Sequence, residues 1–329
     1  MKKQIEQPNK IIFFKRITNL IKYFLSSYGL WFVFMILIVI SSILSPRFLD
    51  YRNLTNIIRQ FSILGVLAVG MTFVILSGGI DLSVGSIMAF SCVLIPVIAP
   101  FVNYSIPMTI LICLVSGSVF GAINGIIISY GKLQPFIVTL GMSAIAEGAA
   151  FILSGGRPII LEDMTWRVFG QSYFLGIPNL ALIFFIAVIV GQFILSKTVF
   201  GTYVYAIGNN EEAVKLSGIR AEIHKMLVYI ISGLLASVGG VMMVTRISVG
   251  DPGVGTGYAL DVIAAVVVGG TRLGGGFGSV VNTLLGASII SVLNNLFNLL
   301  NISPYPQMVF KGIIIIVAVL FEEIRKRRE

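Results

Sequence analysis

Charged residues, histidine and cysteine are all scarce in this chain of 329 residues. Asp, Glu, Lys and Arg together make up 11% of the sequence, and there are only one histidine, His224, and two cysteines. No HExxH, GxSxG, CxxC or GxxxxGK[ST] motif occurs, so zinc-hydrolase, serine-hydrolase, redox and nucleotide-binding sites lack their ligands. Cys92 and Cys113 fall in apolar segments, where a free cysteine is usually a small buried hydrophobic residue. We therefore expect no catalytic site, no cofactor and no metal site in this chain.

Long runs of hydrophobic residues are abundant in the sequence. Hydrophobic residues make up 57% of the chain, and its mean hydropathy is +0.98. Because a membrane-spanning helix needs about 20 mostly apolar residues, this composition is typical of a polytopic membrane protein. We predict an all-α fold of about ten transmembrane helices, some of them broken or short, at 28–44, 57–76, 84–102, 108–130, 135–153, 180–195, 226–245, 261–270, 280–300 and 307–321. The eighth segment is too short to cross a bilayer as a regular helix.

Basic residues are unevenly distributed between the predicted loops. Lys and Arg are concentrated in the N-terminal tail, in the segment 197–225 and at the C-terminus. Because cytoplasmic loops carry the excess of Lys and Arg, both termini and the segment 197–225 are predicted to be cytoplasmic. The formal net charge of +9 then reflects membrane topology, so we expect lipid contacts and no nucleic-acid partner.

These boundaries divide the chain into three parts. Residues 1–27 form a basic cytoplasmic tail, residues 28–321 a transmembrane domain, and residues 322–329 a second basic tail. Within the first tail, apolar residues between Ile11 and Phe24 recur at helical spacing, with basic residues largely on the other side. That pattern fits either an interfacial helix lying on an anionic membrane surface or a plain basic flank of the first span.

The segment 197–225 is the longest run in the second half of the chain that a bilayer could not hold. Asn209 and Asn210 are residue types that cap helix N-termini, and Gly218 supplies a left-handed stop. Together they predict one helix of about eight residues, which is too short to be stable alone in water. We expect such a helix either to dock on a partner or to lie in a solvated loop tied down by its neighbours.

Two glycine-rich stretches resemble each other. VILSGGIDLSVGS, around Gly78–Ser86, and VVVGGTRLGGGFGS, around Gly269–Ser279, are both apolar runs broken by paired glycines and closed by Gly-Ser. Internal repeats with interrupted helices are common in transporters, where the broken helix brings backbone groups to the transport pathway. Chance similarity between two glycine-rich apolar segments explains the match as well.

Ionisable residues near the apolar segments are few, namely Asp81, Glu147, Asp261 and Lys311. Each costs about 2.5–3.5 kcal/mol at the centre of a spanning helix, so any that lies there needs a partner or a function. Our hypothesis is that Asp81 pairs with Arg272, its opposite-charge counterpart in the second glycine-rich stretch. Solvent-facing loop charges are the alternative.

Polar residues within the apolar segments are candidates for the transport pathway. Together with the two charges of the glycine breaks, the candidates are Asp81, Ser83, Asn124, Arg272, Asn294 and Asn295. Their alternative role is hydrogen bonding between helices, which is the usual role of such residues. Glycines are expected to permit close helix approach at positions 65, 70, 121, 125, 286 and 312.

Four long stretches resemble the membrane permease of ribose-type carbohydrate ABC importers. They are AVGMTFVILSGGIDLSVGS, AIGNNEEAVKLSGI, GTGYALDVIAAVVVGGTRLGGGFGS and LLGASIISVLNNLFNLLNISPYPQMVFKGIIIIVAVL. They occur in the family's order, and the resemblance runs from about Arg47 to Leu320. Extended matches of this kind are far more specific than any single motif.

The resemblance implies the membrane subunit of an ATP-driven importer of a sugar or sugar-like solute. Its expected partners are a cytoplasmic ABC ATPase, which binds the ATP and Mg²⁺, a second permease copy or close relative, and an extracytoplasmic sugar-binding protein. By analogy, the helix that couples the permease to the ATPase contains Gly208, Asn210, Glu211, Glu212, Ala213, Ser217 and Gly218. The alternative is a secondary transporter driven by an ion gradient, for which Asp81 and Glu147 are the plausible pair of titratable groups.

Overall fold

The computed structural model describes residues 29–326, so the predicted interfacial helix between Ile11 and Phe24 lies outside the described part. The described chain is almost entirely helical, with two small two-stranded sheets. After the helix Gly29–Leu44 come α2 (Tyr51–Leu76), α3 (Val84–Ile98), η1 (Ala99–Val102), α4 (Ile106–Ser129), α5 (Pro135–Ser154), α6 (Met164–Gln171), α7 (Asn179–Lys197), α8 (Val199–Leu216), α9 (Ala221–Ile247), α10 (Tyr258–Val268), α11 (Val280–Leu299) and α12 (Pro304–Lys326). The strands are β1 (Ile159–Ile160), β2 (Tyr173–Phe174), β3 (Ile177–Pro178) and β4 (Val249–Gly250), paired antiparallel as β1–β4 and β2–β3.

The apolar helices match the predicted spans in order and number. Seven helices in the described part are long and apolar enough to cross a membrane, and three shorter apolar helices are Gly29–Leu44, α10 and residues 304–317 of α12. α10 has 11 residues, which corresponds to a length of about 16 Å and is too short to span a bilayer. The prediction of an all-α polytopic fold, with a short eighth segment, is therefore confirmed.

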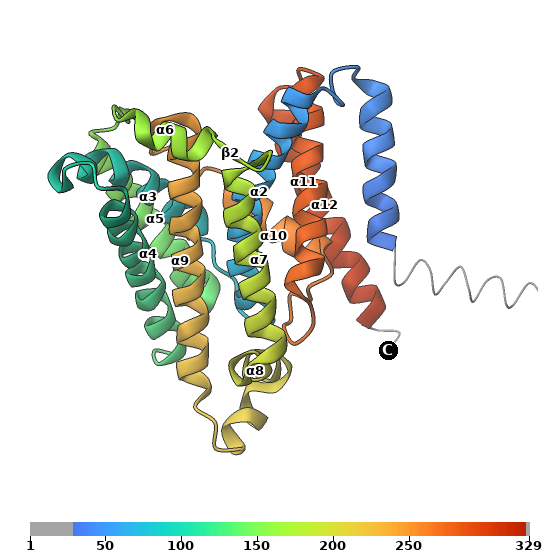
Figure 1. Ribbon diagram of the computed structural model, residues 1–329. Coiled ribbons are helices and arrows are strands. Elements are labelled where there is room, and N and C mark those ends of the chain that lie inside the picture. The colour runs from blue at the N-terminus through green and yellow to red at the C-terminus, as the bar shows by residue number, and fades with distance from the viewer. Residues whose placement is uncertain (1–28, 327–329) are drawn as a thin grey trace, which may run out of the picture.

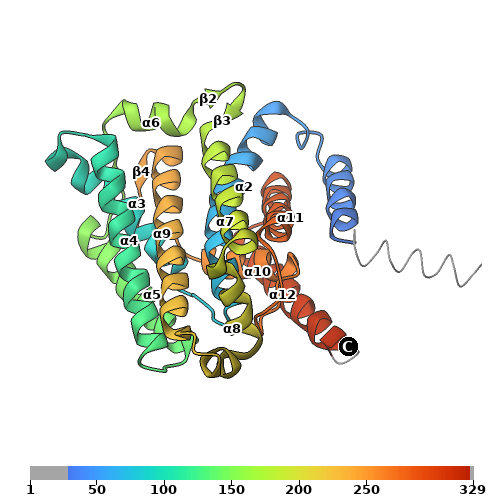
Figure 2. The same ribbon diagram turned by 60° about the horizontal axis from the view of Figure 1, so that its bottom comes forward.

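α2 and α9 form the centre of the bundle, with α3, α4 and α7 around them (Figures 1 and 2). Every residue of α2 from Ser62 to Leu76 is buried, whereas 22% of the spanning window of α5 is buried. A helix that is apolar and buried on all sides belongs to a protein core. The exposed apolar faces of α4, α5 and α7 are instead available to lipid or to other subunits.

Small residues bring the central helices into close contact, as the sequence predicted. A Cβ atom on Gly121 of α4 would overlap the backbone of Tyr229 in α9, and one on Gly286 of α11 would overlap the carbonyl oxygen of Ala265 in α10. The expected glycines at 65, 70 and 125 also meet another helix within 4 Å. Gly312 has nothing within 4 Å within the described residues, so that prediction is wrong for this chain on its own.

Both glycine-rich stretches are interruptions between helices. Residues 77–83 separate α2 from α3, and residues 269–279 separate α10 from α11. We refer to them as the first and second breaks. α8 lies at the end of the bundle opposite to α6 (Figures 1 and 2).

Candidate functional site

The polar segment between α7 and α9 is more helical than its sequence suggested. α8 starts at Val199, directly after α7, and its 18 residues contain a kink at Asn210, whose φ and ψ are −161° and 97°. The Asn210 side-chain oxygen accepts the Ala213 backbone N–H at 3.0 Å, so Asn210 caps a new helical turn. That turn ends at Gly218, which has a φ of +80°. The predicted short helix is confirmed, with Asn210 as its N-cap and Gly218 as its left-handed stop, but an unpredicted helical stretch precedes it.

The first part of α8 was missed because it alternates between apolar and small residues rather than showing a long apolar run. Gly201, Val204 and Ile207 are buried, so this stretch is held by packing on its neighbours. Asn209, which we expected to act as a cap, instead donates from Nδ2 to the carbonyl oxygen of Tyr205 at 2.9 Å and to that of Gly276 at 3.4 Å. Asn209 therefore ties α8 to the second break.

A cluster of opposite charges holds the last turn of α8 against α9. Glu211 lies 2.7 Å from Lys215 and 2.8 Å from Lys225, and Lys215 is also 3.2 Å from Glu222. Burial works to raise the pKa of Glu211, but hydrogen bonds from the two lysines outweigh it and keep that pKa below its ordinary value. The hydrogen bond that Lys215 donates to Glu211 raises the pKa of Lys215. The pair is therefore charged at neutral pH.

Gly208 is the point at which α8 meets the second break and the end of α2, where the first break begins. A Cβ atom at this position would overlap the carbonyl oxygen of Leu76, which ends α2, and the backbone nitrogen of Gly276 in the second break. Those two groups are themselves hydrogen-bonded, because the Gly276 N–H donates to the Leu76 carbonyl oxygen at 2.9 Å. Tyr205 adds a bond from its hydroxyl to the carbonyl oxygen of Gly278 at 2.8 Å. We call this contact of α8 with the second break and the end of α2 the Gly208 junction.

Asp81 and Ser83 of the first break belong to a buried network with α4 and α9. The Asp81 carboxylate accepts the Ser83 backbone N–H at 2.9 Å and its hydroxyl at 2.5 Å, and its other oxygen accepts the Ser232 hydroxyl at 2.7 Å. Asn124 donates to the Ser83 hydroxyl oxygen at 3.0 Å. Asp81, Ser83 and Asn124 are all fully buried. A carboxylate bound by several donors can stay in an apolar core, so this cluster fastens the break to its neighbours.

The hypothesis that Asp81 pairs with Arg272 is corrected by these contacts. Both oxygens of Asp81 accept hydrogen bonds from Ser83 and Ser232, and the Arg272 guanidinium lies 4.8 Å from the centre of the Phe277 ring. Asp81 is fully buried, and the neighbouring hydroxyl groups supply hydrogen bonds to its carboxylate, so it does not need a positively charged partner. The two breaks do meet, as the hypothesis required, but through their backbones, because a Cβ atom on Gly275 would lie 3.0 Å from the backbone nitrogen of Gly78.

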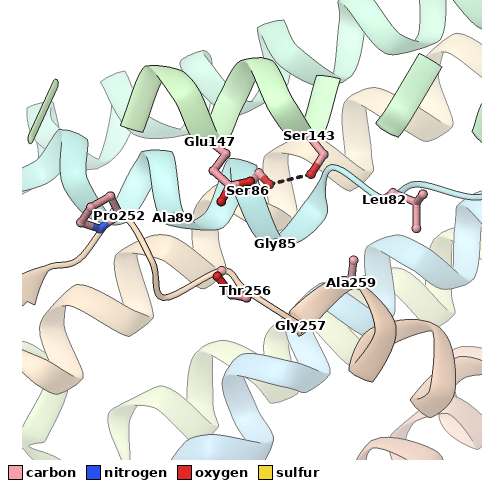
Figure 3. A pocket seen from close by; sticks show the side chains of 11 residues that line it. Leu82, Gly85, Ser86, Ala89, Ser143, Glu147, Pro252, Thr256, Gly257 and Ala259 are labelled. Atoms are coloured by element: carbon pink, nitrogen blue, oxygen red, sulfur yellow. Dashed lines mark hydrogen bonds between the residues drawn. The ribbon is translucent and has the colours of Figure 1, made fainter. Parts of the chain in front are cut away.

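A small polar cavity lies at the start of α3 (Figure 3). It has a volume of about 180 Å³ and is bordered by α3, α5 and the loop before α10. Ser86 and Ser143 point toward each other across it, with their hydroxyl oxygens 2.7 Å apart. Glu147, one turn beyond Ser143, also lines the cavity. Asp81 is fully buried away from solvent, so the structure does not join it to Glu147 as a titratable pair.

The two asparagines predicted on α11 have different surroundings. Asn295 forms a reciprocal amide pair with Asn53 of α2, with N···O distances of 2.8 and 3.1 Å. That pair is an interhelical link. Asn294 instead lines a second, larger cavity that also contains Asp261 and Lys311. Of the six pathway candidates, Asn294 is therefore the one that lines either of these two cavities.

Sequence reasoning missed the roles of Ser86, Ser143 and Ser232, which carry no sequence signal beyond small size and polarity. It also left Asp261 and Lys311 unassigned, although they are joined by an ion pair of 2.8 Å. Opposite charges in two apolar segments were the signal that could have identified the pair. Among the described residues, no group of His, Cys, Asp or Glu side chains is arranged to hold a metal ion.

Comparison with known proteins gives a consistent result over most of the chain. Residues 53–319 match the family described as "Branched-chain amino acid transport system / permease component". The chain is 42% identical to the ribose import permease of Bacillus subtilis over 87% of this chain and 89% of that protein. It is 44% identical to the ribose import permease of Haemophilus influenzae over 87% and 90% of the two chains.

A more distant relative extends the comparison to a second sugar. The chain is 34% identical to the L-arabinose ABC transporter permease of Azospirillum brasilense, over 91% of this chain and 88% of that protein. No solved structure matches. The family match covers both breaks, α8 and all but one of the apolar helices. The chain therefore belongs to the family of transport-system permease components, and it is a multi-pass membrane subunit for transport rather than an enzyme.

Proposed function

We propose that this chain is the permease subunit of an ATP-driven importer of a sugar or sugar-like solute in a bacterial inner membrane. Its proposed partners are a cytoplasmic ABC ATPase, a second permease copy or close relative, and an extracytoplasmic binding protein. ATP and Mg²⁺ are bound by the ATPase. Support comes from relatives that are named as ribose and arabinose permeases, at 33–44% identity over most of the chain.

The observation that carries the proposal is the Gly208 junction. Closure of an ATPase on the end of α8 pushes on a helix whose backbone is in direct contact with the second break and with the end of α2, where the first break begins. Because interfaces between packed elements switch between discrete arrangements, a small displacement of α8 moves the two breaks together. ATP binding then biases the permease between an outward-open and an inward-open packing.

The last turn of α8 has the surface that a docking element needs. Leu216 is 89% exposed, and Glu212, Ala213, Ser217 and Gly218 beside it are exposed as well. An exposed large apolar side chain surrounded by small and charged residues is a common feature of protein interfaces. This surface is the proposed docking site of the ATPase.

The exposed face of α5 supports the proposal of a second permease. Ile145, Glu147 and Gly148 are exposed on this helix, which is long and apolar enough to span the membrane. A carboxylate facing lipid costs several kcal/mol, on the order of 2.5–3.5 on insertion scales, so water or protein must cover Glu147. A partner permease across a water-filled pathway meets that requirement.

Affinity purification in mild detergent tests this function. We expect a tagged chain to bring an ABC ATPase with it and, in vesicles, to support sugar uptake that requires ATP. Leu216→Asp should release the ATPase because it places a charge in the apolar contact. Leu175→Asp is the matched control, since Leu175 is 88% exposed in the β2–β3 turn at the other end of the molecule.

Two results would overturn the proposal. One is a wild-type chain that is purified alone and still transports after ATP has been removed, which would favour an ion-gradient transporter. The other is equal ATPase recovery with Leu216→Asp and Leu175→Asp, which would move the docking site away from the end of α8.

A further inference from the structure

The larger of the two polar cavities lies between α2, α10, α11 and α12. Its volume of about 420 Å³ falls in the range of small-molecule sites, which is roughly 300–1,000 Å³. It is separated from the smaller cavity by the loop that precedes α10, because Thr256 and Gly257 line both. The residues lining it include Gln60, Arg246, Tyr258, Asp261, Asn294, Asn298, Gln307 and Lys311.

An ion pair lies in the wall of this cavity, inside the apolar helices. Lys311 of α12 donates to Oδ2 of Asp261 at 2.8 Å, and Asn294 of α11 donates to the same oxygen at 3.3 Å. Both interactions end on Oδ2, and within residues 29–326 no hydrogen bond reaches Oδ1 of Asp261. Three helices thus converge on one carboxylate that keeps an acceptor oxygen for a ligand.

The remaining polar groups of the wall suit a solute with several hydroxyl groups. Gln307 donates from Nε2 to the Asn298 side-chain oxygen at 3.2 Å, and Gln60 and Tyr258 add an amide and a phenol. A sugar hydroxyl both donates and accepts, and amide side chains offer both functions at once. Leu64 and Met308 supply apolar contact beside them, which matches the C–H face of a sugar ring.

A purely structural role explains the ion pair less well. Replacement of a buried ion pair by apolar residues of similar size is often neutral or stabilising, so stability alone does not require one between α10 and α12. Each charge also carries an insertion cost of about 2.5–3.5 kcal/mol at the centre of a spanning helix. A charged pair beside a cavity of this size is instead suited to hold a polar ligand.

We propose that this cavity is the sugar-recognition site of the permease, that Asp261 and Asn294 contact the hydroxyl groups of the solute, and that Lys311 positions Asp261. The inference rests on the proposed function, and it assigns part of the substrate selection to the membrane subunit. Its position beside the loop 251–257 and the N-terminus of α10 puts it next to a short interrupted helix, where transporters commonly bind their solutes.

The double variant Asp261→Leu with Lys311→Met tests whether the ion pair recognises the sugar or only stabilises the fold. It removes both charges while keeping apolar volume, so we expect the thermal midpoint of the purified complex to stay within a few degrees of wild type. Uptake of D-ribose and L-arabinose into vesicles that contain the whole complex should fall by tenfold or more. If uptake persists at the wild-type rate with the same KM, the pair is structural and the proposal fails.

Asn294→Cys gives a second test that does not depend on loss of activity. The chain's own cysteines are both buried, so a methanethiosulfonate reagent should react mainly at the introduced thiol. We expect D-ribose, added with its binding protein and ATP, to slow labelling at position 294 severalfold. Wild-type protein, whose own cysteines are buried, gives the background labelling, which should not change with sugar.

These experiments distinguish failure of the cavity assignment from failure of the proposed function. Wild-type vesicles that take up neither D-ribose nor L-arabinose with ATP would contradict the proposed function for these sugars. Wild-type vesicles that transport, combined with an Asn294→Cys variant whose labelling sugar does not slow, would contradict the cavity assignment alone. Retained uptake ratios for D-ribose and L-arabinose in Asn294→Ala would contradict it as well, because loss of a hydroxyl contact changes discrimination between sugars.

Discussion

At the scale of single residues, Asp81 and Gly208 contribute in different ways: the first through its carboxylate and the second through its lack of a side chain. Asp81 is a charge in a spanning region, but Ser83 and Ser232 satisfy it, and its role is to hold the first break in place. Gly208 has no chemistry of its own, yet its lack of a side chain lets three backbone segments meet. The residue that transmits force in this fold is therefore expected to be the glycine.

Gly208→Ala should weaken both folding and coupling. The added methyl group overlaps backbone atoms of Leu76 and Gly276 rather than the end of a flexible side chain. Overpacking of this kind costs about 1–3 kcal/mol. We expect a lower thermal midpoint and ATP hydrolysis that no longer drives uptake, measured on the same vesicles.

Gly274→Ala is the matched control for that variant, because it lies in the same break and has nothing within 4 Å of an added Cβ. It should retain coupled uptake. Equal behaviour of the two variants would show that the Gly208 junction does not transmit motion.

Glu211→Gln should lower stability in a pH-dependent way. The pKa of Glu211 is held below its ordinary value, so its charge stabilises the folded state above the unfolded pKa of about 4.5 and loses this effect as the pH falls through the folded pKa. We expect a lower thermal midpoint than wild type at pH 7 and a smaller difference once the pH is below the folded pKa, which itself lies below 4.5. A difference that does not change as the pH is lowered would contradict a role for the charge.

At the scale of elements, α8 is two helices joined at a kink, and the kink directs the second helix. The first part packs on the bundle through Gly201, Val204 and Ile207, while the second part presents Leu216 to solvent. Asn210 makes the change of direction, because its extended backbone breaks the helix and its side chain caps the next turn.

Asn210→Ala should remove that cap at a cost of about 1 kcal/mol. We expect ATP-dependent uptake to fall severalfold while the amount of permease in the membrane stays unchanged, as measured by immunoblotting against a C-terminal tag. Asn210→Asp retains the side-chain acceptor and should restore most of the uptake. Failure of Asp to do better than Ala would mean that the cap does not position the docking turn.

At the scale of the whole molecule, the two ends of the bundle are proposed to bind different partners. α8 and its exposed Leu216 lie at one end, and α6 with the β2–β3 turn lies at the other (Figures 1 and 2). The distribution of Lys and Arg predicts that the α8 end is cytoplasmic.

Cysteine labelling tests this orientation. In vesicles that contain the permease without its ATPase, a membrane-impermeant maleimide should label Leu175→Cys when the vesicles are right-side-out and Leu216→Cys when they are inside-out, since both positions are almost fully exposed in the chain itself. Wild-type protein, whose cysteines are buried, gives the background. The reverse pattern would invert the proposed topology and place α8 out of reach of a cytoplasmic ATPase.

Much of the architecture follows from local sequence alone. Long apolar runs specify spanning helices wherever they occur, because a bilayer leaves backbone groups no other partners. Asn210, Gly218 and the paired glycines are likewise local signals, since capping and left-handed turns depend on a few adjacent residues. The number of apolar helices, the short α10, both breaks and the capped turn of α8 were all predicted on this basis.

The tertiary structure alone decided which distant groups meet. Asp81 bonds to Ser232 across 151 positions in sequence, and Asp261 pairs with Lys311 although Arg272 lies nearer in the chain. Nothing local distinguishes these partners, because hydroxyls and charges in apolar segments are compatible with many neighbours. The Gly208 junction and the cavity beside Asn294 depend on how the helices pack, and packing depends on contacts far apart in sequence.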